Sequence, residues 1–322
     1  MTEKIASSKI SSPSQAVLGE GAKSTATVAL CALLVGAVFM GISPVFVRLA
    51  DVGPFTSAFW RVCAALPVLW VWSRTESKAL PIGQGWSWPV VIAGALFAGD
   101  LFFWHLAIVH TSIANATFLA TLAPVWVLLG SSFILREPVT ANMWGGLMIC
   151  LIGAGALLGS SLGLAPERLL GDAFGGLTSV FFGGYFLATR YARRSLGPDG
   201  LMFRSSIVTA AILFLAALFL EDALFPQTWL GVAALAGLVL MAHAAGQGLL
   251  AYALGRLTAG FSALVIFLEA LIAAVFAWVA LGETLTILQI IGGAMILSGI
   301  WFARPSGAAI LRKYKPLDKF NK

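Results

Sequence analysis

Charged residues are scarce in this 322-residue chain, because Asp, Glu, Lys and Arg together make up only 11% of it. A soluble domain typically carries about 25% charged residues, which solvate its surface. Hydrophobic residues instead make up 59% of the sequence, and the mean hydropathy is +0.93. This shortage of charge argues against a soluble globular protein of this size.

Other missing features exclude further kinds of protein and binding site. The three cysteines, Cys31, Cys63 and Cys150, lie within apolar runs and have no metal-site spacing, so we expect neither a disulfide framework nor a bound metal. The sequence has no phosphate-binding loop of the ATPase type. Three histidines without an HExxH pattern are too few for a typical zinc enzyme. We therefore expect no cofactor and no catalytic residues.

Ten apolar runs of roughly 20 residues dominate the chain, and each is long enough to cross a ~30 Å hydrocarbon core as a helix. The runs do not alternate polar and apolar residues, which barrel strands would do. The sequence therefore predicts an all-α membrane protein with ten transmembrane helices. Their expected ranges are 27–47, 55–73, 88–109, 112–134, 141–159, 171–190, 202–220, 228–250, 258–281 and 286–303.

The distribution of positive charge predicts the orientation. With residues 1–26 placed in the cytoplasm as a disordered tail, sixteen of the twenty Lys and Arg residues fall in inside segments. Only Arg48 and Arg168 fall outside. This positive-inside bias predicts a multi-pass protein of the plasma (inner) membrane, with a basic cytoplasmic tail at 305–322. It also explains the net charge of +6 without a nucleic-acid partner.

The chain contains an internal repeat. Residues 122–137 align with 268–283, both ending on glutamate, and residues 41–48 resemble 183–190. Further matches follow at the offset of the first pair: Thr140 with Thr286, Gly146 with Gly292 and Gly153 with Gly299. The halves, 27–160 and 171–304, each hold five spans. Because five is odd, the second half begins on the opposite side of the membrane, as in the inverted repeats of secondary transporters.

These features resemble the drug/metabolite transporter superfamily, and in particular its EamA-type ten-helix permeases. The matching residues are Leu-Arg-Glu137 and Leu-Gly-Glu283, each followed by a threonine and a glycine-rich span, together with Pro124, Arg61 and Arg204. The chain departs from the family at Ala270, where a proline is common. The resemblance implies export or exchange of small metabolites, commonly amino acids or drug-like compounds, by alternating access.

Ionisable side chains inside the spans are candidates for the substrate site, because they are costly in a bilayer. Asp100 shares a helix face with Trp104, and His105 lies further round. This group suits a cationic or zwitterionic substrate or a proton, although a structural hydrogen bond is an equal alternative. Glu269 is either a proton carrier or a packing residue. The full set of expected lining residues is Asp100, Trp104, His105, Asn115, Gln247 and Glu269, with Phe103, Tyr185 and Tyr252 as weaker candidates.

Four further charges suggest gates or structural anchors: Arg61, Arg204, Glu137 and Glu283. Depth in the membrane would let Arg204 meet Glu137 and Arg61 meet Glu283, which gives one ion pair between the halves at each surface. Simple helix-end polarity is the alternative for the glutamates. For the arginines, anchoring by long side chains is the favoured role, and binding of a substrate carboxylate is the alternative.

The sequence thus predicts a secondary transporter whose partners are a small-molecule substrate and the lipid bilayer. A channel-like facilitator is the main alternative, and an intramembrane enzyme is a weaker one. Proton coupling and a homodimer are both compatible with the sequence, which does not identify the substrate or the direction of transport.

Overall fold

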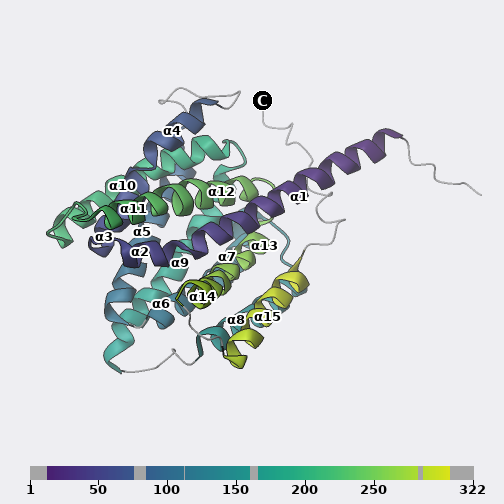
Figure 1. Ribbon diagram of the computed structural model, residues 1–322. Helices are drawn as coiled ribbons and strands as arrows, with labels where there is room; N and C mark the ends of the chain where they lie inside the picture. The colour runs from purple at the N-terminus through teal and green to yellow at the C-terminus, as the bar shows by residue number, and fades with distance from the viewer. Residues whose placement is uncertain (1–12, 76–84, 112, 160–165, 282–285, 305–322) are drawn as a thin grey trace, which may run out of the picture.

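The computed structural model describes residues 13–75, 85–111, 113–159, 166–281 and 286–304, and within these ranges all regular structure is helical (Figure 1). The α-helices are α1 (Pro13–Gly41), α2 (Ser43–Leu49), α3 (Pro54–Cys63), α4 (Leu66–Thr75), α5 (Trp88–His110), α6 (Ile113–Ala120), α7 (Ala123–Gly130), α8 (Ala141–Leu158), α9 (Leu169–Ala192), α10 (Pro198–Leu220), α11 (Trp229–Gly237), α12 (Gly248–Leu254), α13 (Ala259–Val265), α14 (Phe267–Leu281) and α15 (Ile287–Ala303). Two π-helices, η1 (Ser131–Leu135) and η4 (Leu238–Gln247), and the short 3-10 helix η3 (Pro166–Arg168) join them.

Eight of the ten predicted spans are long and apolar enough to cross a membrane within the described ranges: Ser24–Val47, Pro54–Thr75, Trp88–His110, Asn115–Leu135, Ala141–Leu158, Pro198–Leu220, Trp229–Leu254 and Ala259–Phe276. The two other predicted spans are also helical. They correspond to α9, with 24 residues, and to α15, an apolar helix of 17 residues. The all-helical class is therefore confirmed for the described residues, and the count of ten membrane spans stays a prediction.

The matched residues of the repeat have matching local roles. Thr140 caps α8, with its Oγ1 accepting a hydrogen bond from the Met143 N–H at 3.3 Å. Thr286 caps α15 in the same way, accepting from the Gln289 N–H at 3.2 Å, and Gln289 completes a capping box. Each threonine begins the last helix of its half, which explains why the two positions match in the sequence repeat.

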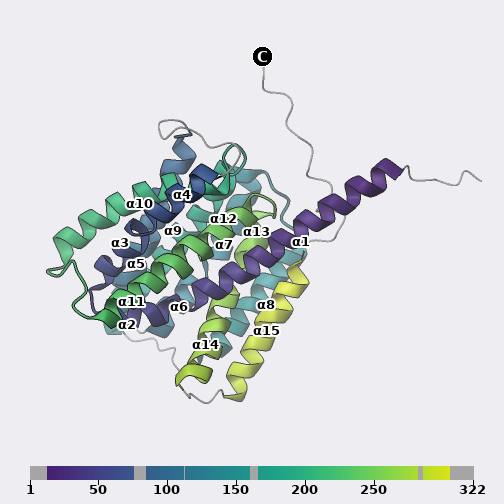
Figure 2. The ribbon, with the colours of Figure 1, turned by 45° about the horizontal axis from the view of Figure 1, so that its top comes forward.

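Glycines allow α8 and α15 to pack closely, side by side in both views (Figures 1 and 2). A Cβ on Gly146 would lie 2.6 Å from the Gly299 carbonyl oxygen, and one on Gly299 would lie 2.8 Å from that of Gly146. Gly153 and Gly292 oppose each other in the same way, at 2.7 and 2.5 Å. Gly146 thus faces Gly299, the repeat equivalent of Gly153, and Gly153 faces Gly292, the repeat equivalent of Gly146. A twofold axis that relates the two helices produces this reciprocal pattern.

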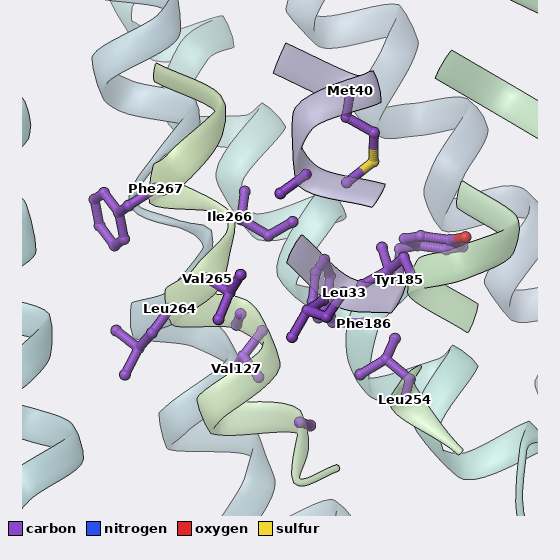
Figure 3. Close-up of a cluster of buried hydrophobic side chains, with 14 of the residues drawn as sticks. Leu33, Met40, Val127, Tyr185, Phe186, Leu254, Leu264, Val265, Ile266 and Phe267 are labelled. Carbon is purple, nitrogen blue, oxygen red and sulfur yellow. The ribbon is translucent and has the colours of Figure 1, made fainter. Parts of the chain in front are cut away.

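The remaining helices form a bundle in which α5 packs against α9 and α10. The helix α1 crosses this bundle and extends beyond it at its N-terminal end (Figures 1 and 2). Figure 3 shows Leu33 and Met40 of α1 directed into a buried cluster with Tyr185 of α9 and with Val265 and Ile266 at the end of α13. Segments of both halves thus meet in one core.

Candidate functional site

Arg61 on α3 is the centre of a buried polar cluster. Its side chain is buried, yet its Nε has no hydrogen-bond partner in the described part of the chain. Asp100 on α5 and Glu269 on α14 lie within electrostatic range of it. The ion pair found among the described residues is a different one, between Arg190 and Glu137. Arg61 therefore lies near two carboxylates without a direct contact at 4.0 Å or less.

The carboxylates are also available for binding. Glu269 has a buried Oε1 without a hydrogen-bond partner in the described ranges. Asp100 is 8% exposed, and no hydrogen bond to its carboxylate is found in the same ranges. Buried charges are normally paired or hydrogen-bonded, because an isolated one is costly. Three unpaired charges close together therefore indicate a place for a ligand.

Two histidines flank Arg61 and interact with it electrostatically. The His105 Nδ1 lies 2.5 Å from the Leu101 carbonyl oxygen of its own helix, and the His243 Nε2 lies 2.9 Å from Ser206 Oγ. The other ring nitrogen of each, Nε2 of His105 and Nδ1 of His243, has no partner among the described residues. Each imidazole therefore has one polar atom left for a ligand.

Aromatic rings lie against these polar groups. The Tyr185 ring is 4.8 Å from that of Phe97, and its hydroxyl donates to Gln247 Oε1 at 3.2 Å. Phe97 also stacks on His243 at 5.7 Å, and Phe55 lies 6.2 Å from His105. The arrangement can hold a small molecule that combines charge with an apolar or aromatic group.

Both halves of the chain contribute to this cluster. The first half supplies Arg61, Asp100 and His105, and the second supplies His243, Gln247 and Glu269 together with Tyr185. His243 and Gln247 lie on the π-helix η4. Departures of this kind from α geometry are frequent at functional sites.

A second charged contact lies at one end of the bundle. Arg190 Nε donates to Glu137 Oε1 at 2.8 Å, and the other Glu137 oxygen accepts from the Ala259 N–H at 3.0 Å. Arg190 also donates to the Leu254 carbonyl oxygen at 2.7 Å. Glu137 thus forms an ion pair between the two halves with Arg190, which was not the partner expected from the sequence.

The other predicted gate charges differ from expectation. Arg204 donates to the Gly200 carbonyl oxygen at 3.0 Å and lies near Asp199. Glu283 lies outside the described residues, so its expected pairing with Arg61 is untested. Arg61 itself lies in the last turn of α3, buried in the central cluster and within electrostatic range of Asp100 and Glu269.

Four of the predicted lining residues have their observed contacts at the edge of the Arg61 cluster or outside it. Trp104 packs edge-on against His105 at 5.0 Å. Phe103 contacts Phe174 and Phe181 of α9. Asn115 donates to Asp172 Oδ1 at 3.0 Å, and Tyr252 lies under the Arg256 guanidinium at 3.7 Å from the ring centroid.

Sequence reasoning did not select His243, Ser206 or Arg190. His243 has the same signal as the residues that were chosen, a titratable group in the middle of an apolar span. Arg190 could have been found from the repeat, because segment 183–190 matches 41–48 and ends on the same residue type. The acceptor of the Asn115 amide, Asp172, could not be predicted without knowing that α6 lies against α9.

Comparison with known proteins supports a transport role. The model of the EamA-like transporter family matches residues 27–159 and again 169–304. The chain belongs to this family. The match confirms the resemblance seen in the sequence, and the two matched segments of this EamA-like transporter cover most of its described helices.

Individual relatives agree with the family. An uncharacterized transporter of Archaeoglobus fulgidus is 29% identical over 200 residues, 61% of this chain and 69% of the relative. The aromatic amino acid exporter YddG of Ancylobacter novellus is 30% identical over 155 residues, 46% of this chain and 53% of the exporter, so the match spans about half of that protein. The family and both names indicate transport rather than catalysis.

A solved crystal structure has the same fold. It superposes with a TM-score of 0.75 over 87% of this chain and 97% of its own, at 20% sequence identity.

Among the described residues, no group of three His, Cys, Asp or Glu side chains could hold a metal ion.

Proposed function

We propose that this EamA-like transporter is a secondary carrier of small zwitterionic or cationic metabolites, such as amino acids or drug-like compounds. It exports or exchanges them by alternating access in the inner membrane. Ten transmembrane helices form two inverted five-helix halves, with both termini in the cytoplasm. The two halves rock about the central cluster and expose it to one side at a time.

The exchange of glycine contacts between α8 and α15 supports the inverted arrangement. Gly146 faces Gly299, and Gly153 faces Gly292, where Gly146 matches Gly292 and Gly153 matches Gly299. A pair of equivalent helices related by a twofold axis makes reciprocal contacts of this kind. Inverted halves place the transport site near the middle of the membrane, between the repeats.

The observation that carries the proposal is a set of three charges from both halves, the buried Arg61 and Asp100 and the partly buried Glu269, for which the described residues supply no ion-pair partner at 4.0 Å or less. In the proposed complex, a substrate carboxylate binds Arg61, and a substrate ammonium binds between Asp100 and Glu269. The aromatic rings of Phe97 and Tyr185 give an apolar group a place to pack. The name of the Ancylobacter relative, an aromatic amino acid exporter, is consistent with this combination.

The proposal is tested in two steps. Metabolite profiling of cells that overexpress or lack the protein identifies compounds whose export changes, and flux of the best compound is then measured in proteoliposomes. We expect saturable counterflow that falls at least tenfold in Arg61→Gln and Asp100→Asn, while Glu167→Gln, at an exposed carboxylate, behaves as wild type. Flux without saturation or counterflow would favour the channel-like alternative, and unchanged flux in both site variants would contradict the assigned site.

A further inference from the structure

The end of the bundle that holds the pair of Glu137 with Arg190 is strongly basic. The ends of η1, α9 and α12, with the residues directly after them, contain one acidic residue, Glu137. Its carboxylate already binds Arg190 and the Ala259 N–H. The same segments contain five arginines: Arg136, Arg190, Arg193, Arg194 and Arg256. Positive charge is therefore in excess here, and Arg136 and Arg194 form no ion pair within the described ranges.

Arg136 and Arg194 meet at one peptide group, although they belong to different halves. Arg194 Nη2 donates to the Leu135 carbonyl oxygen at 2.5 Å, and this carbonyl is part of the peptide bond that joins Leu135 to Arg136. The Arg194 guanidinium also lies over the Tyr191 ring, 5.1 Å from its centroid, which restricts its position further. Both arginines are exposed. Two cationic side chains are thus presented at one place on the surface.

The backbone of Arg136 indicates a role for its side chain. Arg136 ends η1 with a φ of 53°, and in the described part of the chain it is the one residue other than glycine with a left-handed backbone. Glycine adopts this conformation without the steric cost that a side chain brings, and the repeat has Gly282 at the equivalent position of the second half. An arginine held against this preference points to a function for the guanidinium group.

An exposed apolar surface borders the two arginines. Phe133 is 84% exposed and Ile134 is 57% exposed, and Tyr191 beside Arg194 is 45% exposed. In a membrane protein such side chains contact acyl chains, and arginines next to them lie at the level of the lipid headgroups. Guanidinium groups bind phosphate through paired, charge-assisted hydrogen bonds. A zwitterionic headgroup would bring an ammonium group next to two cations, so charge complementarity favours an anionic lipid.

We propose that Arg136 and Arg194 bind the phosphate of one anionic phospholipid, whose acyl chains lie against Phe133 and Ile134. The phosphate joins the first half to the second beside the pair of Glu137 with Arg190, so the bound lipid stabilises the contacts at this end. The site is separate from the central cluster, and it does not depend on the proposed transport function.

Lipid binding is measured on the purified full-length protein in detergent, by titration followed with native mass spectrometry. Phosphatidylglycerol is the anionic probe, and phosphatidylethanolamine with the same chains is the zwitterionic one. We expect one phosphatidylglycerol to bind roughly tenfold more tightly than phosphatidylethanolamine. Its affinity should fall about fivefold in Arg136→Gly and in Arg194→Gln. Arg136→Gly should melt no lower than wild type without lipid, because glycine suits the left-handed backbone.

Two controls distinguish this site from other sources of binding. Arg74 on α4 is also exposed and lies over the Trp70 ring, 5.7 Å from its centroid, so Arg74→Gln removes an equivalent charge elsewhere and should leave the affinity unchanged. Glycerol 3-phosphate carries the phosphate without chains and should not displace the lipid. Equal affinity for the two lipids, or an equal loss in Arg74→Gln, would overturn the proposal. Displacement by glycerol 3-phosphate would overturn it in favour of a site for free phosphate.

Discussion

Arg190 on α9 and Glu137, just after η1, form an ion pair of 2.8 Å that links the second half of the chain to the first. The same glutamate caps the backbone of Ala259, where α13 begins, and the same arginine binds the Leu254 carbonyl at the end of α12. This partly buried pair thus holds four segments together at one end of the bundle: α9, the residues after η1, α12 and α13. Alternating access requires some contact of this kind to open and close.

Removal of one partner of this pair should destabilise the protein strongly. Glu137 is 3% exposed, and Glu137→Ala would leave the Arg190 charge without its carboxylate and the Ala259 N–H without an acceptor. Breaking a buried pair in this way typically costs about 3–5 kcal/mol. We expect a clear fall in the detergent melting temperature, with a smaller fall for Glu137→Gln, which keeps an acceptor. Equal stability of wild type and Glu137→Ala would contradict this role.

A second carboxylate caps α3 across the halves. Glu221, just after α10, accepts from the Phe55 N–H at 2.6 Å and from the Thr56 N–H at 2.9 Å. Loss of a helix cap costs about 0.5–2 kcal/mol, so Glu221→Ala should lower the melting temperature moderately. Because α3 carries Arg61, we also expect weaker substrate binding. Asp222→Ala is the control, since the neighbouring Asp222 makes no hydrogen bond within the described ranges; a matching loss there would contradict a specific cap.

Asp51 should give stability a weak pH dependence. Hydrogen bonds from Thr228 and from the Gln227 N–H, the latter at 3.0 Å, lower the pKa of this exposed carboxyl below its ordinary value of 3.8. The stabilisation is therefore present above that ordinary value and is lost as pH falls through the lowered one. Melting temperatures from pH 6 down to about pH 3 should fall slightly more steeply for wild type than for Asp51→Asn. Parallel curves would show that the hydrogen bonds do not favour the ionised form.

The packing of α8 on α15 allows a matched test with glycine. A Cβ at Gly153 would lie 2.7 Å from the Gly292 carbonyl oxygen and 2.9 Å from Met295 Cβ, so Gly153→Ala must push the helices apart. Overpacking of this kind typically costs about 1–3 kcal/mol. Gly176 on α9 has no atom within 4 Å of the corresponding position. Gly176→Ala should therefore be neutral or slightly stabilising in the same melting assay, and equal effects of the two substitutions would contradict the close approach.

Part of the site was accessible from sequence. Asp100, His105, Gln247, Glu269 and Tyr185 stand out because each puts a polar group within a long apolar run, and the structure brings all five to one place. Arg61 was interpreted as an anchor or gate charge, with substrate-carboxylate binding as an alternative, because its position along the span shows its depth and does not show which helices it faces. The structure pairs Glu137 with Arg190, and comparable depth along the spans could not identify this arginine, since it does not show which residues are neighbours.

The sequence by itself determined the helices and the repeat. Run length against bilayer thickness gives membrane-spanning helices, and the matched Thr140 and Thr286 mark where the last helix of each half begins. Only the tertiary structure decided that Arg61 lies within electrostatic range of Asp100 and Glu269 and that Glu137 pairs with Arg190. These contacts depend on the rotation of each helix about its axis and on which helices are adjacent, and both are set by packing between segments far apart in the chain.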